Sequence, residues 1–165
     1  MRLGSSDGAR VELRLLRYEF PDRAAAGPGR DWDANWLVVR GDVRCADGRV
    51  WSFEDPCLTT WEGRLLGRWL HEVVAGAVAP SPSDGGKDER PVVFTEPNLA
   101  LSLAAADQET VNIRVHLSHE ALPPWLAHAD GTELFEFFVV VRLSRADLAR
   151  AAQDWERELA VFPER

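Results

Sequence analysis

The stretch NWLVVRGDVRCADGRVWSFED, residues 35–55, contains the clearest local signal for the fold. Its first half alternates apolar and polar side chains, as a strand with one buried face does. Asp47-Gly48 then supplies a residue pair able to take positive φ, which a tight type I′ hairpin turn requires. The segment VWSFE returns as a second strand, so the sequence predicts a β-hairpin that pairs Cys45 with Val50.

Directly after this hairpin the hydrophobic period changes from that of a strand to that of a helix. Residues 55–77 place large apolar side chains on one helical face and charged side chains on the other. Thr59 with Glu62 forms a capping box, and Gly76 provides a helix stop. Residues 145–162 are predicted to form a second helix, whose buried stripe comprises Leu148, Ala152, Trp155 and Leu159.

Further strands are predicted on both sides of this central region, in residues 11–20, 91–96, 98–104, 110–118 and 133–144. Residues 110–118 alternate, with His116 among the side chains expected to face outward. Residues 133–144 are apolar on both faces at their centre, which is typical of a central strand covered on both sides. The predicted fold class is α+β: a mainly antiparallel, meander-like sheet of about six or seven strands, with one mid-chain helix and one C-terminal helix.

The length and charge of the chain narrow the classes of protein to which it can belong. With 165 residues it is expected to form a single domain over residues 1–165. The 19 basic and 27 acidic residues give a net charge of -8, which would repel a nucleic-acid backbone and suits a basic partner. The negative net charge is equally consistent with a role in solubility alone, without any basic partner. Residues 78–90, rich in Pro, Ser and Gly, are expected to form a mobile loop.

The lack of a recognisable targeting segment and the cysteine usage predict a cytoplasmic location. No segment has the composition of a signal peptide or of a membrane span, so we expect no membrane association. The two cysteines, Cys45 and Cys57, form no CxxC motif, and two free thiols fit a reducing compartment. The register of the hairpin also separates the two sulfur atoms.

The hexapeptide FEDPCL, residues 53–58, returns in similar form as FTEPNL, residues 94–99. In both copies a proline follows a carboxylate. Each proline is expected to terminate or bend a strand, because proline cannot donate a ladder hydrogen bond. The commoner explanation is that two strand ends use similar residues. The alternative is that both turns lie at one edge of the sheet and offer carboxylates to a cation or to a basic side chain.

Candidate catalytic and metal-binding residues are few. His116, His119 and His128 lie near one another in the sequence, yet no Cys or HExxH pattern supports a metal site, and we expect these side chains to be solvated. No GxSxG motif and no phosphate-binding loop are present. The sequence therefore predicts no catalytic residue, no metal site and no cofactor.

One constellation of residues suited to binding occurs in DWDANW, residues 31–36, where a loop is expected to enter a strand. Tryptophan beside carboxylate and amide groups can grip a sugar or a protein loop. In the simpler interpretation, Trp36 belongs to the core and the polar side chains satisfy the local backbone. The candidate binding residues here are Asp31, Trp32, Asp33 and Asn35. In the acidic second loop they are Asp84, Asp88 and Glu89.

An ordered set of motifs spans nearly the whole chain. It comprises YEFPD (18–22), DANWL (33–37), FEDPCLTTWE (53–62), FTEPNL (94–99), IRVHLS (113–118) and FPER (162–165). In order and spacing this set resembles a family of small bacterial proteins that includes the WapI-type immunity proteins. The resemblance implies a cytosolic, non-enzymatic protein that binds and blocks the C-terminal domain of a cognate toxin. It also implies framework roles for Asn35, Trp36, Pro56, Pro97 and Asn98.

Two classes of function therefore remain open. The first is a toxin-neutralising immunity protein that binds a cognate toxin domain through an acidic face, with the two acidic loops supplying contacts. The second is a small-molecule or carbohydrate-binding domain that uses Trp32 and its neighbours. The resemblance carries over no catalytic residue to either class.

Overall fold

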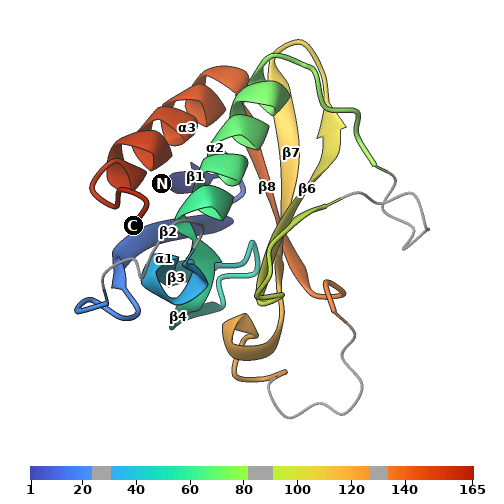
Figure 1. Cartoon of the computed structure of the whole chain (residues 1–165). Helices are drawn as coiled ribbons and strands as arrows, with labels where there is room; N and C mark the ends of the chain where they lie inside the picture. The colour runs from blue at the N-terminus through green and yellow to red at the C-terminus, as the bar shows by residue number, and fades with distance from the viewer. Residues whose placement is uncertain (24–30, 82–90, 127–133) are drawn as a thin grey trace.

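In the computed structural model, which describes residues 1–23, 31–81, 91–126 and 134–165, antiparallel sheets combine with two long helices (Figure 1). The predicted α+β class is confirmed. The strands of the described residues do not form one meander, however, because they divide into two sheets of four strands each. The four strands that precede the long mid-chain helix form one sheet, and the four that follow it form the other.

The two sheets follow one another in the sequence. The first has the order β1-β2-β3-β4, with β1 (Arg2–Gly4), β2 (Arg10–Tyr18), β3 (Trp36–Arg44) and β4 (Val50–Thr59). The second has the order β5-β6-β7-β8, with β5 (Val92–Val93), β6 (Leu99–Ala106), β7 (Thr110–Leu117) and β8 (Phe138–Ser144). All neighbouring strands are antiparallel. Both β1 and β2 contact β8, so the sheets meet along one side.

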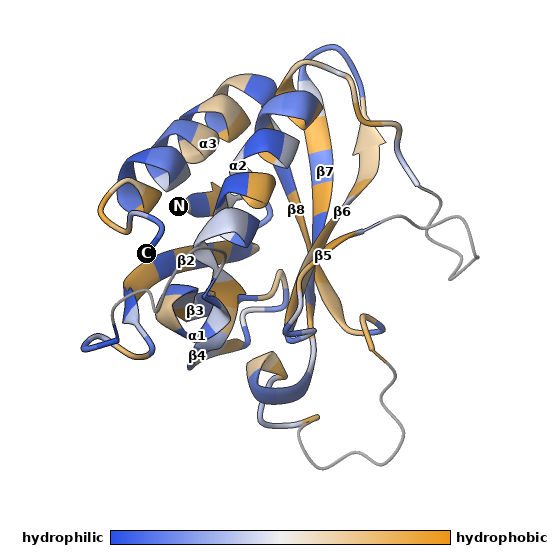
Figure 2. Cartoon of the chain, viewed as in Figure 1, coloured by the Kyte–Doolittle hydropathy of each residue, from blue (hydrophilic) through white to orange (hydrophobic). Residues whose placement is uncertain are grey.

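Helices cover the junction of the sheets. α2 (Thr60–Val74) and α3 (Arg145–Leu159) lie side by side (Figure 1). The one-turn helix α1 (Trp32–Asn35) precedes β3, and the 3-10 turn η1 (His119–Ala121) follows β7. Both long helices carry hydrophobic as well as hydrophilic residues (Figure 2), as amphipathic helices do. Apolar residues of both sheets and both helices join one buried cluster, which includes Leu13, Leu37, Leu66, Ile113 and Trp155.

The predicted β3–β4 hairpin forms, but its turn differs from the predicted one. The pairing of Cys45 with Val50 is wrong, because the Cys45 N–H donates to the carbonyl of Arg49 at 2.9 Å. Gly48 has a φ of 90°, whereas Asp47 keeps a negative φ. The Asp47 carboxylate accepts from the Arg49 N–H at 3.0 Å, and this local bond stabilises a turn with one left-handed residue instead of two.

The strand β8 lies at an edge of the second sheet, so its predicted central position is wrong. Its residues alternate in burial: Val139 and Val141 are buried, whereas Phe138 and Val140 are partly exposed. A continuous apolar run predicts a strand, but it does not show which of its faces has a partner. Here one apolar face packs into the core, and the other remains at the surface of the described residues.

The predicted helix signals are confirmed. Thr59 and Glu62 form both hydrogen bonds of the capping box at the start of α2, and Gly76 has a φ of 75° just beyond its C-cap. The Ser144 side chain accepts from the Asp147 N–H at the start of α3. The predicted stripe of α3 is buried and consists of Leu148, Ala152, Trp155 and Leu159.

Both cysteines are free thiols, as predicted. The segment expected to be mobile is described only as far as Ser81, and residues 82–90 lie outside the described residues. Ser81 itself is buried, and its N–H donates to the carbonyl of Leu103 at 2.9 Å, so this end of the segment is anchored on β6. No helix in the described part of the chain is long and apolar enough to cross a membrane.

Candidate functional site

The two similar hexapeptides meet in the folded chain. Asn98, from the second copy, donates a hydrogen bond from Nδ2 to Oδ2 of Asp55, from the first copy, at 2.8 Å. Asn98 is fully buried directly before β6, and Asp55 lies in β4 of the other sheet. The hydrogen bond therefore ties one sheet to the other at the position of the two motifs.

A second carboxylate strengthens this junction. Glu62, in the first turn of α2, accepts from the Thr59 N–H at 2.8 Å and from the Thr59 hydroxyl at 2.9 Å through Oε2. Through Oε1 it accepts from the N–H and the hydroxyl of Thr95 at 2.7 and 2.8 Å. Thr95 belongs to the second hexapeptide. The buried carboxylate thus has four donors, as a buried charge requires.

Each proline of the two motifs bends or interrupts a strand, as predicted. Pro56 lies within β4 opposite Val38, next to a shift in register between Leu37 and Val38. Such a bulge re-aims the side chains beside it. Pro97 lies in the turn between β5 and β6. In this arrangement the carboxylates that precede the two prolines, Asp55 and Glu96, come to the same place on the surface.

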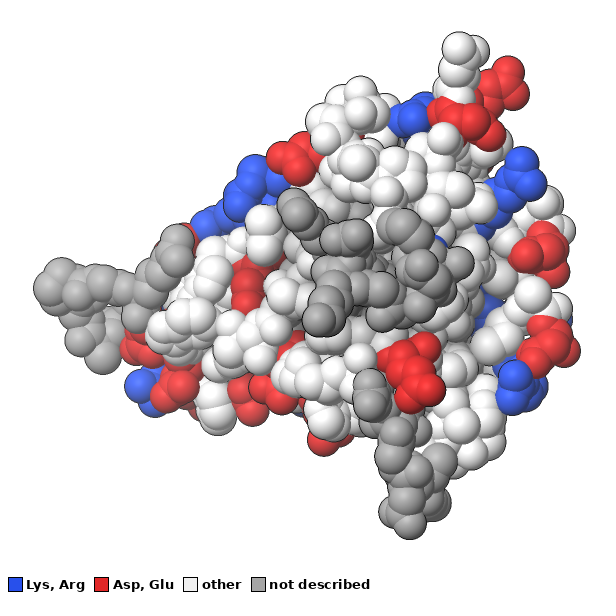
Figure 3. All heavy atoms as spheres, turned by 90° about the vertical axis from the view of Figure 1, so that its right-hand side faces the viewer, with Lys and Arg blue, Asp and Glu red and all other residues white. Residues whose placement is uncertain are grey.

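That place is a pocket of about 400 Å³ with a strongly acidic lining. Its carboxylates come from β4, α1, η1, the residue after β2 and the turn before β6. The lining residues are Glu19, Phe20, Asp33, Trp36, Asp55, Pro56, Glu96 and Glu120. None of these described residues carries a positive charge. Figure 3 shows acidic side chains gathered along the lower edge of one face of the molecule.

Most carboxylates of the pocket have no ion-pair partner in the part of the chain that the structure describes. Asp33 is paired with Arg23, with 3.0 Å between Nη1 and Oδ2. Among the described residues, the other four carboxylates have no ion-pair partner; they belong to Glu19, Asp55, Glu96 and Glu120. Like charges that share a site destabilise one another, and a cation placed among them would relieve that repulsion.

The pKa values of two pocket carboxylates, Asp55 and Glu19, are raised by burial and by neighbouring negative charges. Burial, together with the charges of Glu120 and Glu96, raises the pKa of Asp55, against the opposing effect of the hydrogen bond from Asn98. Burial and the charge of Asp33 likewise raise the pKa of Glu19. Both carboxylates therefore hold their protons more strongly than ordinary surface carboxylates, although each remains close to solvent.

The predicted binding residues of the first loop have different roles. Asp31 is the N-cap of α1, with its carboxylate accepting from the Ala34 N–H at 3.2 Å. Trp32 is 46% exposed and packs edge-on against Trp61, with 4.9 Å between ring centroids. Of these predicted residues, Asp33 lines the acidic pocket. The candidates Asp84, Asp88 and Glu89 lie outside the described residues.

Asn35 is a buried anchor and offers no surface for binding. Its Nδ2 donates to the carbonyl of Arg165 at 2.8 Å, and its Oδ1 accepts from the Arg165 N–H at 3.0 Å and from the Thr60 hydroxyl at 2.8 Å. The Arg165 guanidinium lies over the ring of Tyr18, 3.6 Å from its centroid. Asn35 therefore holds the FPER segment against α1 and β2, which is a framework role.

His116 is buried, so the prediction that it faces solvent is wrong. The side chains of Ser102 and His116 are each 1% exposed, and Ser102 Oγ lies 2.8 Å from His116 Nε2. His116 Nδ1 lies 2.8 Å from the carbonyl of Phe135, which can only accept, so this nitrogen carries a proton. The rings of Phe135 and Phe138 pack edge-on against the imidazole and exclude water from it.

The described residues contain no group of three or more His, Cys, Asp or Glu side chains arranged to hold a metal ion. His119 is exposed, as expected, and His128 lies outside the described residues. The carboxylates of the acidic pocket are thus spaced around a cavity and do not converge on one point. This arrangement suits an extended, hydrogen-bonding cation such as a basic side chain.

Most of the acidic residues of the pocket belong to the sequence motifs, although the pocket itself was not predictable from them. Glu19 belongs to YEFPD, Asp33 to DANWL, Asp55 to FEDPCL and Glu96 to FTEPNL, so four of the sequence motifs each supply one carboxylate. The sequence showed these acids singly and gave no sign that they share a cavity. Glu120 follows β7 outside any of these motifs, and no sequence signal pointed to it.

Comparison with known proteins agrees with the motif pattern. Over residues 2–163 the sequence matches the family described as the immunity protein WapI-like family. No curated protein and no solved structure matches the chain significantly. Because the family match covers nearly the whole sequence, the chain belongs to the WapI-like immunity protein family.

Proposed function

We propose that this protein neutralises a toxin in the cytoplasm by binding the toxin's C-terminal domain, and that the acidic pocket receives a basic side chain of that domain. Membership of the WapI-like immunity protein family carries the proposal. The acidic pocket supports it, because four carboxylates without ion-pair partners in the described residues are suited to a positively charged partner.

The lining of the pocket fits an arginine or a lysine of the partner. Phe20 and Trp36 supply aromatic surface, and Pro56 adds an apolar wall. A guanidinium can stack on an aromatic ring while it donates to carboxylates on either side. The aliphatic stem of the same side chain can cover the apolar wall. One long basic side chain would therefore satisfy both kinds of surface in the pocket.

The exposed tryptophan beside the pocket adds a second type of contact. Trp32 follows the N-cap of α1 and directly precedes Asp33, which lines the pocket. Tryptophan is enriched among the residues that contribute most of the binding energy at protein–protein interfaces. We place Trp32 at the rim of the interface, with the acidic pocket as its centre.

The net charge of -8 would speed the encounter with a basic toxin domain. Complementary potentials raise the association rate, and salt screens them. A stoichiometric blocker benefits from fast association, because free toxin acts until it is bound. In this account the protein works by binding and not by turnover.

The direct test is a titration of the purified protein with the toxin domain encoded beside its gene. We expect a one-to-one complex by calorimetry, together with loss of the toxin's activity in a matched assay. Absence of binding to that domain, combined with binding of a neutral oligosaccharide that is lost in Trp32→Ala, would instead support the carbohydrate-binding alternative.

A further inference from the structure

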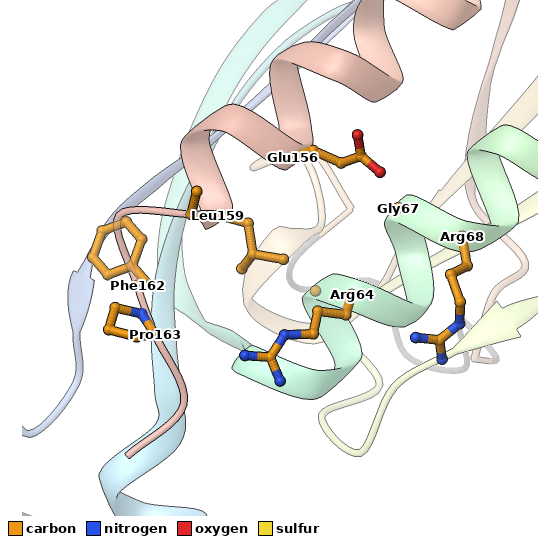
Figure 4. A pocket seen from close by; sticks show the side chains of 9 residues that line it. Arg64, Gly67, Arg68, Glu156, Leu159, Phe162 and Pro163 are labelled. Carbon is orange, nitrogen blue, oxygen red and sulfur yellow. The ribbon is translucent and has the colours of Figure 1, made fainter.

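Two faces of α3 border grooves, and they differ in how far their polar groups are satisfied. Toward α2, Figure 4 shows Arg64 and Glu156, and both are already in ion pairs, with Glu164 and with His71 respectively. Toward β1, α3 lines a second groove, which has a volume of about 560 Å³. Figure 1 shows β1 beside α3, and the two elements are in contact. Because β1 is the outermost strand of the first sheet, this second groove lies at a free sheet edge.

The backbone groups of two β1 residues are open on this edge. The Leu13 N–H donates to the carbonyl of Met1 at 2.9 Å, and the Met1 amino group donates to the carbonyl of Leu13 at 2.8 Å, so these residues form a hydrogen-bonded pair. Bonded and non-bonded pairs alternate along antiparallel strands. Arg2 and Gly4 therefore occupy non-bonded positions, and their N–H and C=O groups point away from β2, on the side of the groove that both residues line. Within the described residues these four groups have no hydrogen-bond partner.

The outer face of the first sheet is basic beside this edge. Arg2, Arg10 and Arg44 share that face, and Arg10 lies directly between Gly4 on β1 and Arg44 on β3. Like charges directly opposite one another destabilise a sheet. The carboxylates of the same face are already paired with other arginines. In the described part of the chain none of these three arginines has an ion-pair partner, and Arg10 Nε is a buried donor without an acceptor. A carboxylate placed beside Gly4, which has no side chain, would lie next to Arg10.

The side of the groove formed by α3 has a different character. Leu143 of β8 and Ala151 of α3 are buried apolar residues that line it. The two arginines of its rim, Arg150 and Arg157, are each paired with an aspartate three residues earlier on α3. Successive side chains of a strand point to opposite faces. A strand added beside β1 would therefore fit best with acidic residues on the arginine face, alternating with apolar residues toward α3.

We propose that the open edge of β1 binds an extended acidic peptide segment of a partner protein as an added antiparallel strand. Extended peptides bind in this way at exposed sheet edges, where the backbone hydrogen bonds supply affinity and the side chains supply specificity. The acidic residues opposite Arg2 and Gly4 exchange backbone hydrogen bonds with them and place carboxylates on the arginine face. The site is separate from the acidic pocket, so its test does not depend on the toxin-binding function.

The probe is the peptide acetyl-Val-Glu-Val-Glu-Val-amide, titrated to about 5 mM into the full 15N-labelled chain, which detects millimolar dissociation constants. We expect saturable shifts of the Arg2 and Gly4 N–H signals. The same peptide with lysine in place of both glutamates should bind at least about tenfold more weakly. No saturable shift, or equal binding of the two peptides, would overturn the proposal.

Methylated peptides test the backbone hydrogen bonds in the wild-type protein. In an antiparallel added strand the glutamate N–H groups donate to Arg2 and Gly4, whereas the valine N–H groups point away from β1. Methylation of both glutamate nitrogens should weaken binding at least about tenfold, and methylation of the second and third valine nitrogens by less than about twofold. Equal effects of the two methylation patterns would contradict the added strand.

Variants of the chain locate the site. Gly4→Pro removes an N–H that is not bonded to β2, which an edge strand tolerates, and should weaken binding at least about threefold. Gly4→Ala keeps the N–H, its Cβ meets no atom within 4 Å, and binding should be unchanged. Arg2→Gln should weaken binding at least about threefold, whereas Arg68→Gln, an exposed change on α2 outside this groove, should not. Equal affinities of the two Gly4 variants would refute the assignment. So would sedimentation that shows a wild-type dimer dissociated by Gly4→Pro, because the edge would then bind a second copy of the chain.

Discussion

Asn98 holds the carboxylate of Asp55 across the junction of the two sheets, with 2.8 Å between Nδ2 and Oδ2. This contact joins the two similar hexapeptides, since one copy supplies a carboxylate to the pocket and the other supplies the donor that positions it. The two turns do not lie at one edge of a single sheet, as the alternative interpretation had it, because Asp55 belongs to the first sheet and Glu96 precedes a strand of the second. Both carboxylates nevertheless line the same cavity.

Replacement of the donor by an acid gives a sharp test of this contact. In Asn98→Asp a fully buried carboxylate would face Asp55, and two like charges at that distance destabilise the fold. We expect a loss of about 3 kcal/mol or more at pH 7 in urea denaturation, recovered in part at pH 4, where one proton can be shared. Asn112→Asp, a partly buried asparagine of β7, is the control and should change stability little.

The Glu62 carboxylate is predicted to be essential for the junction. Glu62→Gln keeps the shape of the side chain but replaces one acceptor oxygen by a donor, which then faces either Thr59 or Thr95. We expect a loss of about 2 kcal/mol or more in the free energy of unfolding, because buried donors lose their partner. Glu72→Gln, an exposed change on the same helix, serves as the control. A loss no greater than that of the control would contradict this role.

Glu19 is predicted to weaken the fold at neutral pH. Burial and the charge of Asp33 raise its pKa above the ordinary value of a glutamate, so the folded state disfavours the ionised form. Stability is then unaffected below the unfolded-state pKa and falls as the pH rises through the folded-state pKa. Glu19→Gln should equal wild type in melting temperature near pH 3 and exceed it at pH 7. A lower melting temperature than wild type at pH 7 would refute this assignment.

The two thiols are predicted to differ in reactivity. Burial, helped by the charge of Asp55, strongly raises the pKa of Cys57, and burial together with Asp47 raises the pKa of Cys45 to a smaller extent. The thiolate is the reactive form, so both should react slowly at pH 8. With a chromogenic disulfide we expect Cys45, which is partly exposed, to react first and Cys57 to react only as the protein unfolds. Simultaneous fast reaction of both would disagree with the fold.

Features encoded within a few residues could be predicted from the sequence. The capping residues Thr59 and Glu62, the glycine after α2 and the β3–β4 hairpin depend on local chemistry, and they appear where the sequence placed them. The exact turn at Gly48 did not follow, because a side-chain hydrogen bond of Asp47 competes with the two-residue turn. Local signals fix the kind of element more securely than its last residue.

Features that depend on distant segments could not be predicted in the same way. The burial of His116 requires Phe135 and Phe138 to cover its ring, and the edge position of β8 depends on the division into two sheets. The acidic pocket collects residues from five separate segments, as Glu19 and Glu120 illustrate. Their identities were readable in the sequence, whereas their proximity is a property of the tertiary fold.

The central claim, that the acidic pocket binds a basic side chain of the toxin domain, is tested most directly by surface variants of the pocket. Glu96→Gln combined with Glu120→Gln removes two charges that have no ion-pair partner among the described residues. Glu72→Gln combined with Asp154→Asn removes two charges elsewhere, on α2 and α3. Both double variants therefore have the same net charge.

The measurement is the dissociation constant of each double variant with the neighbouring toxin domain, at about 50 mM and about 300 mM salt. We predict that the pocket variant binds at least about tenfold more weakly than wild type at both salt concentrations, because it loses direct contacts. The control variant should differ only at low salt, through slower association. Equal affinities of the two double variants would contradict the claim that the pocket is the centre of the interface.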